Sequence, residues 1–259
     1  MAVQPKKSLG QHWLNDQESL EAMCDAAHVG ADDIVIEIGP GLGTLTKLLV
    51  ERAKQVIAIE FDEQLASMLP NRIPSGNLQV VQQDILSVDF TAFPPGYKIV
   101  ANIPYYLTSN LIRVISETTN PPSMAVLLVQ KEVAERVVAR PGDMSLLSVT
   151  AQFYWETTLD MIVPAELFTP PPKVDSQILV LNRRPELLFP DVDPKDFFRL
   201  VKAGFSQRRK TLLNSLSSGL HLDKETVKTV CQSVEVDPGR RAQTLSLDEW
   251  YALYISLNT

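Results

Sequence analysis

Short apolar runs alternate with longer amphipathic stretches along most of the chain. The runs predict strands over 34–38, 55–59, 78–81, 97–101, 124–129, 158–163 and 177–181. Helical spacing predicts a helix over 16–28, one that carries Leu42, Leu45, Leu48 and Leu49, one capped by Asp62, and one from Thr108. Because strands alternate with helices, we expect a parallel sheet that is covered on both faces.

The pattern changes after residue 184. The segment PELLFPDVDP, which begins at Pro185, has the composition of a linker. The stretch beyond it predicts helices, with stripes made by Phe197, Val201 and Phe205 and by Leu212, Leu213 and Leu216, and with a capping box of Ser246 and Glu249. We therefore predict an α/β domain over 1–184, a linker over 185–193 and a small all-α domain over 194–259.

The composition is that of a folded globular protein, with 45% apolar and 21% charged residues among 259. The longest apolar run, at 124–129, is too short to cross a membrane, and the N-terminus lacks the apolar core of a secretory signal. Cys24 and Cys231 are far apart and predict no disulfide. We expect a cytoplasmic protein without a membrane partner.

Net charge argues mildly against a nucleic-acid partner, since the chain carries −7 and phosphates attract positive potential. The distribution softens this argument. Residues 194–259 contain ten Lys and Arg against seven Asp and Glu, a net charge of +3. Basic clusters lie at Lys6-Lys7, Arg183-Arg184, Arg208-Arg209-Lys210 and Arg240-Arg241, and such runs can also be solvated helix faces.

Each of the first four predicted strands ends in a glycine-rich or polar signal. The first ends in EIGPGLGTLT, which contains Glu37, Gly39, Gly41 and Gly43, and the next three end in Glu60, Asp84 and Asn102. Ligands of open parallel sheets bind outside the carboxyl ends of the strands, so we expect one site here. Glycines let the backbone approach a ligand, Glu60 can accept from ribose hydroxyls, and Asp84 can accept from an adenine amino group.

Two nucleoside cofactors compete for this site. A dinucleotide fingerprint needs GxGxxG, and Thr44 occupies the place of its third glycine. The shorter GxGxG turn, preceded by the acidic Glu37, favours S-adenosylmethionine, which is cationic and has no pyrophosphate. Taken alone, GxGxG can also be only a tight turn.

The tetrapeptide Asn102-Ile103-Pro104-Tyr105 predicts chemistry on an amine. The Asn102 side-chain oxygen and a main-chain carbonyl beside Pro104 can each accept one amino hydrogen, which exposes the nitrogen lone pair to a methyl donor. Tyr105 offers a stacking face for an extruded base. The alternative is a strand that ends in an Asn turn with core aromatics.

Seven segments, taken together and in order, resemble the ribosomal RNA adenine dimethyltransferases of the KsgA (RsmA) type over nearly the whole chain. They are KKSLGQHWLND from Lys6, EIGPGLGTLT, QQDIL, NIPYY, QKEVAERVVARPG from Gln130, FTPPPKVDS from Phe168 and FSQRRKTLLNSL from Phe205. Trp13 departs from the family, which usually has Phe there, and the acidic balance is unusual for an enzyme that acts on RNA.

The resemblance implies roles for individual residues. The cofactor would be S-adenosylmethionine, bound by His12, the Leu14 backbone, Gly39, Gly41, Glu60, Asp84 and Asn102. Asn102, Pro104 and Tyr105 would hold the target adenine, with Phe168 stacked on its other face. Arg208, Arg209 and Lys210 would contact RNA.

The resemblance also implies a substrate and a partner. Family members dimethylate two adjacent adenines in the loop of the 3′-terminal hairpin of 16S ribosomal RNA and act late in small-subunit assembly. We expect a monomer. Two rivals stay open: the related large-subunit adenine methyltransferase of macrolide resistance, and an RNA-binding assembly or transcription factor without turnover. The segment RAQTLSLDEW and the acidic charge favour the small-subunit enzyme.

Overall fold

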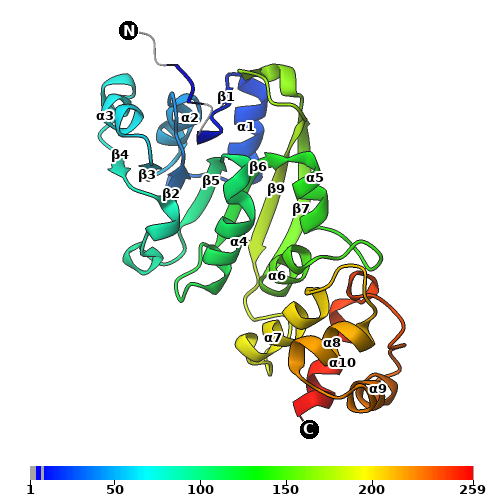
Figure 1. Ribbon diagram of the computed structural model, residues 1–259. Coiled ribbons are helices and arrows are strands. Elements are labelled where there is room, and N and C mark those ends of the chain that lie inside the picture. The colour runs from blue at the N-terminus through cyan, green and yellow to red at the C-terminus, as the bar shows by residue number, and fades with distance from the viewer. Residues whose placement is uncertain (1–3, 7–8, 259) are drawn as a thin grey trace. The chain divides into compact units, whose positions relative to one another are not determined.

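The computed structural model describes residues 4–6 and 9–258 and divides into two compact units (Figure 1). Unit 1 comprises the chain up to Glu135 together with Trp155–Arg183, and unit 2 comprises Arg136–Tyr154 together with the chain from Arg184. Residues 136–154 therefore differ from the predicted division, which placed them in the first domain.

Unit 1 is built on a seven-stranded sheet with the strand order β4-β3-β2-β5-β6-β9-β7. The strands are β2 (Ile34–Ile38), β3 (Gln55–Glu60), β4 (Leu78–Gln82), β5 (Lys98–Asn102), β6 (Met124–Gln130), β7 (Trp155–Val163) and β9 (Ser176–Arg183). All seven overlap predicted apolar runs. Strands β2, β3, β5, β6 and β9 are mostly buried, whereas the edge strands β4 and β7 are only partly buried.

The direction of β9 departs from the parallel sheet that we predict. Strands β4, β3, β2, β5 and β6 pair in parallel, but β9 pairs antiparallel with both β6 and β7. The chain between β7 and β9 holds only the short helix η5 (Ala165–Leu167) and the two-residue strand β8 (Phe168–Thr169). A parallel connection needs a longer crossover, so this segment returns antiparallel.

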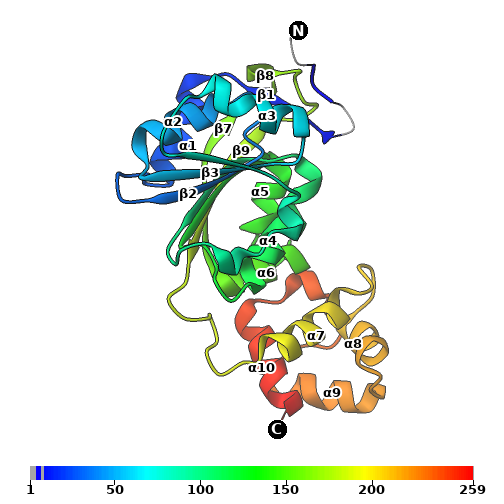
Figure 2. The ribbon, with the colours of Figure 1, turned by 90° about the vertical axis from the view of Figure 1, so that its left-hand side faces the viewer.

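Helices cover both faces of the sheet, as Figure 2 shows. The helices α1 (Gln17–Ala26), α2 (Thr44–Arg52) and α3 (Glu63–Arg72) lie on one face, and α4 (Thr108–Glu117) and α5 (Lys131–Val137) lie on the other. Buried side chains of α1 and α2 form one hydrophobic cluster with alternate strand residues, including Val35, Val56, Val100 and Val126. The predicted Asp62 cap is confirmed, since its carboxylate accepts from the Gln64 and Leu65 amides.

Unit 2 contains the helices α6 (Leu146–Tyr154), α7 (Pro194–Phe205), α8 (Leu212–Leu220), α9 (Lys224–Ser233) and α10 (Leu247–Asn258). An aromatic cluster explains why α6 belongs here: the Phe153 ring stacks on Phe197 at 5.1 Å and meets the Phe198 ring edge-on at 5.3 Å. The capping box is confirmed, because the Ser246 amide donates to Glu249 (2.8 Å) and the Glu249 amide donates to the Ser246 hydroxyl (3.1 Å).

The remaining elements are short. The strand β1 (Trp13–Leu14) pairs antiparallel with β8, and single-turn helices are η2 (Ile85–Ser87), η3 (Phe90–Ala92), η4 (Tyr105–Leu107) and η6 (Ala242–Thr244). Within residues 4–6 and 9–258, every helix is too short or too polar to span a membrane. The predicted α/β class with a small helical C-terminal part is confirmed.

Candidate active site

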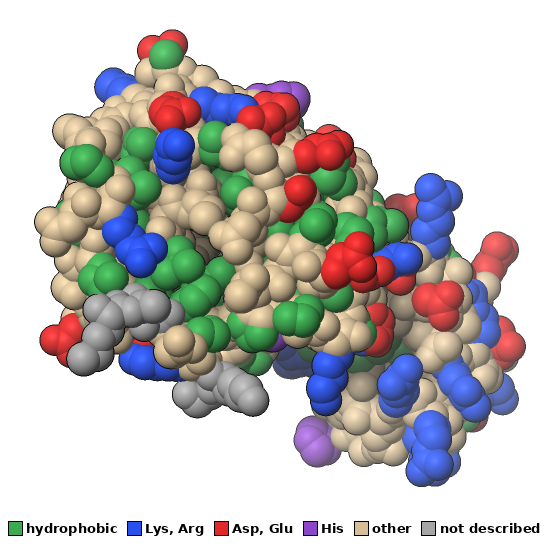
Figure 3. Space-filling model, turned by 90° about the horizontal axis from the view of Figure 1, so that it is seen from above, with side chains coloured by type: hydrophobic (Ala, Val, Ile, Leu, Met, Phe, Trp, Pro, Cys, Tyr) green, Lys and Arg blue, Asp and Glu red, His purple; other side chains and the backbone are tan. Residues whose placement is uncertain are grey.

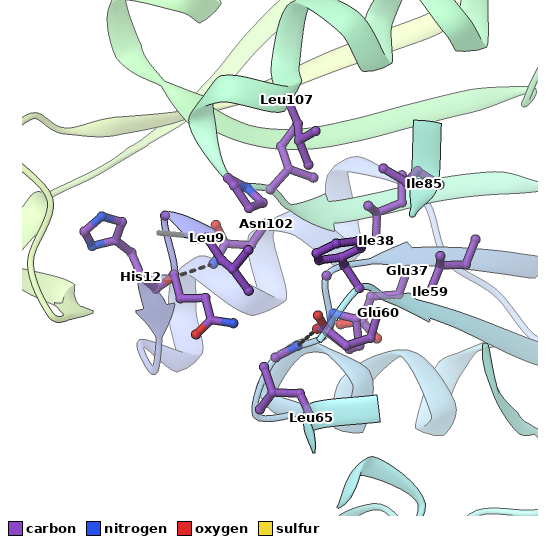
Figure 4. Close-up of a pocket in the computed structure, with 18 of the residues that line it drawn as sticks. Leu9, His12, Glu37, Ile38, Ile59, Glu60, Leu65, Ile85, Asn102 and Leu107 are labelled. Carbon is purple, nitrogen blue, oxygen red and sulfur yellow. Dashed lines mark hydrogen bonds between the residues drawn. The ribbon is translucent and has the colours of Figure 1, made fainter. Parts of the chain in front are cut away.

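The predicted strand endings meet at one cavity in unit 1. The cavity has a volume of about 210 Å³, and its wall includes the predicted residues His12, Leu14, Gly39, Gly41, Glu60, Asp84, Asn102, Pro104 and Tyr105. Figure 4 shows Glu60 and Asn102 reaching this cavity from β3 and β5, the strands on either side of β2. The arrangement is that of a ligand site at the carboxyl edge of a parallel sheet.

The glycine turn brings bare backbone to the cavity wall. Gly39, Gly41 and Gly43 have φ values of +67°, +57° and +85°, which residues other than glycine rarely adopt. A Cβ at Gly41 would lie 3.2 Å from Cδ1 of Trp13, so the indole packs directly on the turn. The unusual Trp13 therefore covers the glycine turn from the N-terminal segment.

Glu60 is a buried carboxylate that the backbone holds at both oxygens. Its Oε2 accepts from the Gly41 amide (3.2 Å) and its Oε1 accepts from the Asp62 amide (2.9 Å). Burial raises the pKa of Glu60, while these two amides act against the shift. Each oxygen keeps a further lone pair, so the fixed carboxylate can accept from two neighbouring hydroxyl groups.

Glu37 is more deeply buried, with 1% of its surface exposed. Burial raises the pKa of its carboxyl to about 8, so that the neutral form prevails at pH 7. In the described part of the chain, Glu37 Oε2 has no hydrogen-bond partner that meets the usual geometry, and the neighbouring Thr46 hydroxyl acts only partly against the rise in pKa. A cationic ligand would stabilise the ionised form of this carboxyl, which fits the predicted cofactor.

Two contacts that sequence reasoning missed fasten the N-terminal segment over the cavity. Thr44 Oγ1 donates to the Leu14 carbonyl (2.9 Å), and Lys6 Nζ lies 2.6 Å from Asp62 Oδ2. Thr44 was considered only as a missing glycine and Asp62 only as a helix cap. Their partners are distant in sequence, and no local pattern reveals such pairs.

Asn102 has a defined orientation. Its Nδ2 donates to the His12 carbonyl at 3.4 Å, so its Oδ1 is the atom that can accept from a ligand (Figure 4). The Pro104 carbonyl already accepts from the Leu107 amide (3.0 Å) and retains one lone pair. Asn102 and Pro104 thus each offer a hydrogen-bond acceptor at the cavity wall.

Tyr105 is fixed through its hydroxyl group, which lies 2.9 Å from Oγ of the fully buried Ser176. Its half-buried ring lies nearly parallel to that of His12, with centroids 6.0 Å apart and an interplanar angle of 19°. Ser176 is the last residue of the FTPPPKVDS segment, in which the sequence reasoning gave a role only to Phe168.

Phe168 does not lie where we predict it. Pairing of β8 with β1 sets Phe168 opposite Leu14, and the ring is 3% exposed within the hydrophobic cluster beneath α1 and α2. It is not part of the cavity wall. The second stacking face expected for an adenine is therefore not formed by Phe168 in this arrangement, because two-residue strand pairing turns the ring into the core.

His12 and Asp84 reach the cavity in specific ways. The His12 ring is turned away from Glu60, and its Nδ1 lies 2.7 Å from the Pro170 carbonyl (Figure 4). Its main-chain carbonyl, not its imidazole, contacts Asn102. Asp84 Oδ1 accepts from the Leu86 amide (3.0 Å), which leaves Oδ2 as the acceptor for a ligand.

The predicted RNA-contact residues Arg208, Arg209 and Lys210 are exposed in the turn between α7 and α8 of unit 2. Arg240 belongs to another of the basic clusters in the sequence. Its side chain forms an ion pair with Glu249 within unit 2, so we assign it a structural role. On the face shown in Figure 3, Lys and Arg side chains gather at one end, and acidic side chains are spread more widely.

A family model described as ribosomal RNA adenine dimethylase matches residues 2–258. Among curated proteins, the ribosomal RNA small subunit methyltransferase A of Dehalococcoides mccartyi is 42% identical over 255 residues, which cover 97% of this chain and 88% of that protein. The protein of the same name from Bacillus cereus is 40% identical over 261 residues, covering 96% and 89%.

Two solved structures are similar over the same extent. A dimethyladenosine transferase from Plasmodium falciparum superposes with a TM-score of 0.78 at 28% identity, covering 95% of this chain and 98% of that one. The 23S rRNA methyltransferase ErmE superposes with a TM-score of 0.74 at 28% identity, covering 95% and 100%.

Proposed function

Because the chain belongs to the ribosomal RNA adenine dimethylase family, we propose that it transfers methyl groups from S-adenosylmethionine to adenine in small-subunit ribosomal RNA. The expected targets are the exocyclic amino groups of two adjacent adenines in the loop of the 3′-terminal hairpin of 16S RNA. The observation that carries the proposal is the oriented Asn102 amide, whose Oδ1 shares a cavity with Glu60 and the glycine turn.

Residues at one end of the cavity fit S-adenosylmethionine, which supplies an electrophilic methyl group on a sulfonium when it is bound. The Glu60 carboxylate would accept from the ribose hydroxyls, and Asp84 Oδ2 would accept from the adenine amino group. The backbone of Gly39 allows close approach, because only the Asn102 carbonyl oxygen lies within 4 Å of its Cβ position. The buried Glu37 carboxyl would ionise beside the positive charge of the ligand.

Residues at the other end would aim the target amine. Asn102 Oδ1 and the main-chain carbonyl beside Pro104 would each accept one amino hydrogen of the adenine. These bonds draw the nitrogen out of conjugation with the ring and present its lone pair, while the Tyr105 ring supports the base. A strong general base is unnecessary, because the proton can leave to water after transfer.

A second methylation at the same nitrogen places one demand on the site. The monomethylated amine has one hydrogen left, so only one of the two acceptors is used, and the other must tolerate a methyl group. The main-chain carbonyl beside Pro104 and the Asn102 oxygen are small acceptors, which suits this double use.

A large-subunit substrate is the second candidate, because ErmE is a 23S rRNA methyltransferase of similar structure. The relatives at 40–42% identity are named small-subunit enzymes, whereas ErmE is 28% identical, so we favour the small subunit. By the same resemblance we expect a monomer that acts in the cytoplasm, late in assembly of the subunit.

Replacement of Asn102 by alanine tests the proposed aiming of the amine. We expect Asn102→Ala to lower the single-turnover rate of methyl transfer by about a hundredfold, because a preorganised acceptor is lost. Cofactor affinity, measured by isothermal titration calorimetry, should change by no more than about threefold.

Asn110→Ala is the matched control, since Asn110 is exposed on α4 and outside the cavity wall. It should transfer methyl groups at the wild-type rate. An Asn102→Ala protein that is folded, binds the cofactor and keeps the wild-type rate would rule out the aiming mechanism.

A further inference from the structure

The Trp13 indole lies on the glycine turn at the wall of the active-site cavity. A Cβ at Gly41 would lie 3.2 Å from Cδ1 and 3.3 Å from Nε1 of Trp13, so the edge of the indole that carries the N–H group faces the turn. The strand β1 pairs with β8, and the main-chain carbonyls on either side of Trp13 accept from the side chains of Asn102 and Thr44. The backbone around Trp13 is therefore fixed, and only its side chain can turn.

The indole N–H group of Trp13 has no acceptor in the protein. Within residues 4–6 and 9–258, Trp13 Nε1 is shielded from water and forms no hydrogen bond. A buried donor that is left unpaired destabilises the ligand-free protein, whereas a Phe in its place would leave no donor unpaired. The chain thus carries, where the family usually has Phe, a donor that a ligand can satisfy.

The cofactor has one negatively charged group, the carboxylate of its amino-acid end, and the cavity wall offers no Lys or Arg to bind it. The described residues of this wall include the carboxyl groups of Glu37, Glu60 and Asp84 but no Lys or Arg side chain. Where these carboxyl groups are ionised, they repel a carboxylate. Neutral N–H donors are therefore the groups that can hold it.

Four side chains of the described wall carry an amide or indole N–H group: Gln11, Trp13, Gln83 and Asn102. Gln83 Nε2 and Asn102 Nδ2 each donate to a main-chain carbonyl, at 3.1 and 3.4 Å, which fixes their amide planes. Gln11 uses only its Oε1, which accepts from the Lys6 amide at 2.7 Å. In the part of the chain that the structure describes, Trp13 and Gln11 donate to no protein group, and both lie on the N-terminal segment.

We propose that Trp13 binds the carboxylate at the amino-acid end of the cofactor through its indole N–H group. Because Nε1 is sealed against Gly41, the ligand reaches it when the indole turns from the glycine turn, and Gln11 Nε2 supplies a second donor from the same segment. The inference deepens the proposed function and rests on it, since it takes S-adenosylmethionine as the ligand. It gives Trp13 a binding role that a Phe at this position would not have.

Two ligands separate a bond to the carboxylate from packing of the ring. S-adenosylhomocysteine has the amino-acid end, and 5′-methylthioadenosine has the same nucleoside without it. Replacement of Trp13 by 3-benzothienylalanine keeps the shape of the indole and removes its N–H group. Isothermal titration calorimetry should then find the binding of S-adenosylhomocysteine weakened roughly tenfold and that of 5′-methylthioadenosine changed by less than about twofold.

Trp13→Phe should show the same roughly tenfold difference between the losses for the two ligands. Phe61→Leu is the matched control, because Phe61 is an exposed aromatic residue of the same wall and has no side-chain N–H group. This variant should change the affinities for both ligands by the same factor. Equal losses for the two ligands in the Trp13 variants, or no loss at all, would overturn the proposal.

Tryptophan fluorescence gives a readout that does not depend on activity. Trp155 and Trp250 are fully buried, whereas Trp13 is partly exposed at the cavity wall. S-adenosylhomocysteine should therefore change the emission of the wild-type protein and leave that of Trp13→Phe unchanged, although Trp155 and Trp250 remain in this variant. The same change in Trp13→Phe, or no change in the wild type, would contradict the contact.

The outcomes separate this inference from the proposed function. Normal methyl transfer to small subunits, together with unchanged ligand affinities in the Trp13 variants, would overturn the role of Trp13 alone. Binding of S-adenosylhomocysteine that depends on the indole N–H group, without methyl transfer to any ribosomal RNA, would support this role and contradict the proposed function.

Discussion

At the scale of single residues, hydrogen bonds to groups distant in the sequence set the orientation of the Asn102 and Tyr105 side chains. The His12 carbonyl accepts from Asn102 Nδ2, and Ser176 Oγ bonds the Tyr105 hydroxyl. Both partners lie far from their targets in sequence, at separations of 90 and 71 residues. The direction in which the amide and the ring face a ligand therefore depends on the complete fold.

The bond between Ser176 and Tyr105 gives a prediction about positioning. Ser176→Ala and Tyr105→Phe should each lower the rate of methyl transfer about three- to tenfold, because the ring loses its anchor, while cofactor affinity stays unchanged. The double variant should be no slower than either single one, since both remove the same bond. Additive losses in single-turnover rates would contradict this role.

Glu37 gives a prediction about pH. Its folded-state pKa of about 8 lies above the ordinary value of 4.5, so between these values the unfolded chain is ionised and the folded chain is protonated. Unfolding then releases a proton, and the contribution of Glu37 to stability falls as the pH rises from 5 to 8.

Glu37→Gln should remove this dependence. Relative to the variant, the wild-type free energy of unfolding should fall by roughly 2 to 4 kcal/mol over that range, measured by urea unfolding without cofactor. Parallel pH profiles for the two proteins would show that the carboxyl is not held neutral.

Which residues form the site could largely be predicted from the sequence. Glu60, Asp84 and Asn102 follow apolar runs, and strands of a parallel sheet end at one edge, so local patterns suffice to bring these residues together. Phe168 could not be placed in this way. Its two-residue strand has no periodicity, and its pairing with Leu14 depends on a segment more than 150 residues away.

At the scale of elements, close helix packing in unit 2 depends on residues without side chains. Gly204 in α7 lies against Trp250 of α10, and a Cβ at Gly219 in α8 would lie 2.6 Å from Cβ of Ala203 in α7. The spacing of apolar residues predicts the apolar stripes on these helices. It does not predict the points where two helices touch, because these points lie at glycines, which do not contribute to the apolar spacing.

Gly204→Ala should therefore destabilise the protein by about 1 to 3 kcal/mol, since the added methyl group overlaps the buried indole. Gly76→Ala is the matched control: nothing lies within 4 Å of its Cβ position, and it should change stability by less than about 0.5 kcal/mol. Equilibrium urea unfolding measures both. Equal stability of the two variants would contradict the close contact.

The reversed strand β9 belongs to this scale as well. Its apolar run predicts a strand, but direction depends on the length of the preceding connection and on whether a helix forms in it. The segment between β7 and β9 is rich in proline and forms only short elements. Periodicity alone does not give the direction of a strand.

At the scale of the whole molecule, the boundary between the units is not a single point in the sequence. Residues 136–154 leave the α/β unit and join the helical one, where Phe153 and Tyr154 contribute to the aromatic cluster. The linker-like segment PELLFPDVDP marks one of the places where the chain passes from one unit to the other. The other two, after Glu135 and after Tyr154, lie at or within helices and strands, and the local composition does not reveal them.

Family membership confirms the predicted enzyme class, an rRNA adenine dimethyltransferase, and the resemblance noted in the sequence. The acidic net charge, which argued mildly against RNA, is concentrated in unit 1, where 20 Asp and Glu stand against 11 Lys and Arg. The charge of the whole chain was therefore a poor guide to its partner, because binding depends on local potential.

Transfer of a labelled methyl group from S-adenosylmethionine to unmethylated small ribosomal subunits tests the central claim most directly. Nuclease digestion and mass spectrometry of the RNA should find N6,N6-dimethyladenosine at two adjacent positions in the 3′-terminal hairpin of 16S RNA. Label in large subunits alone, on another base or on no RNA at all would contradict the account.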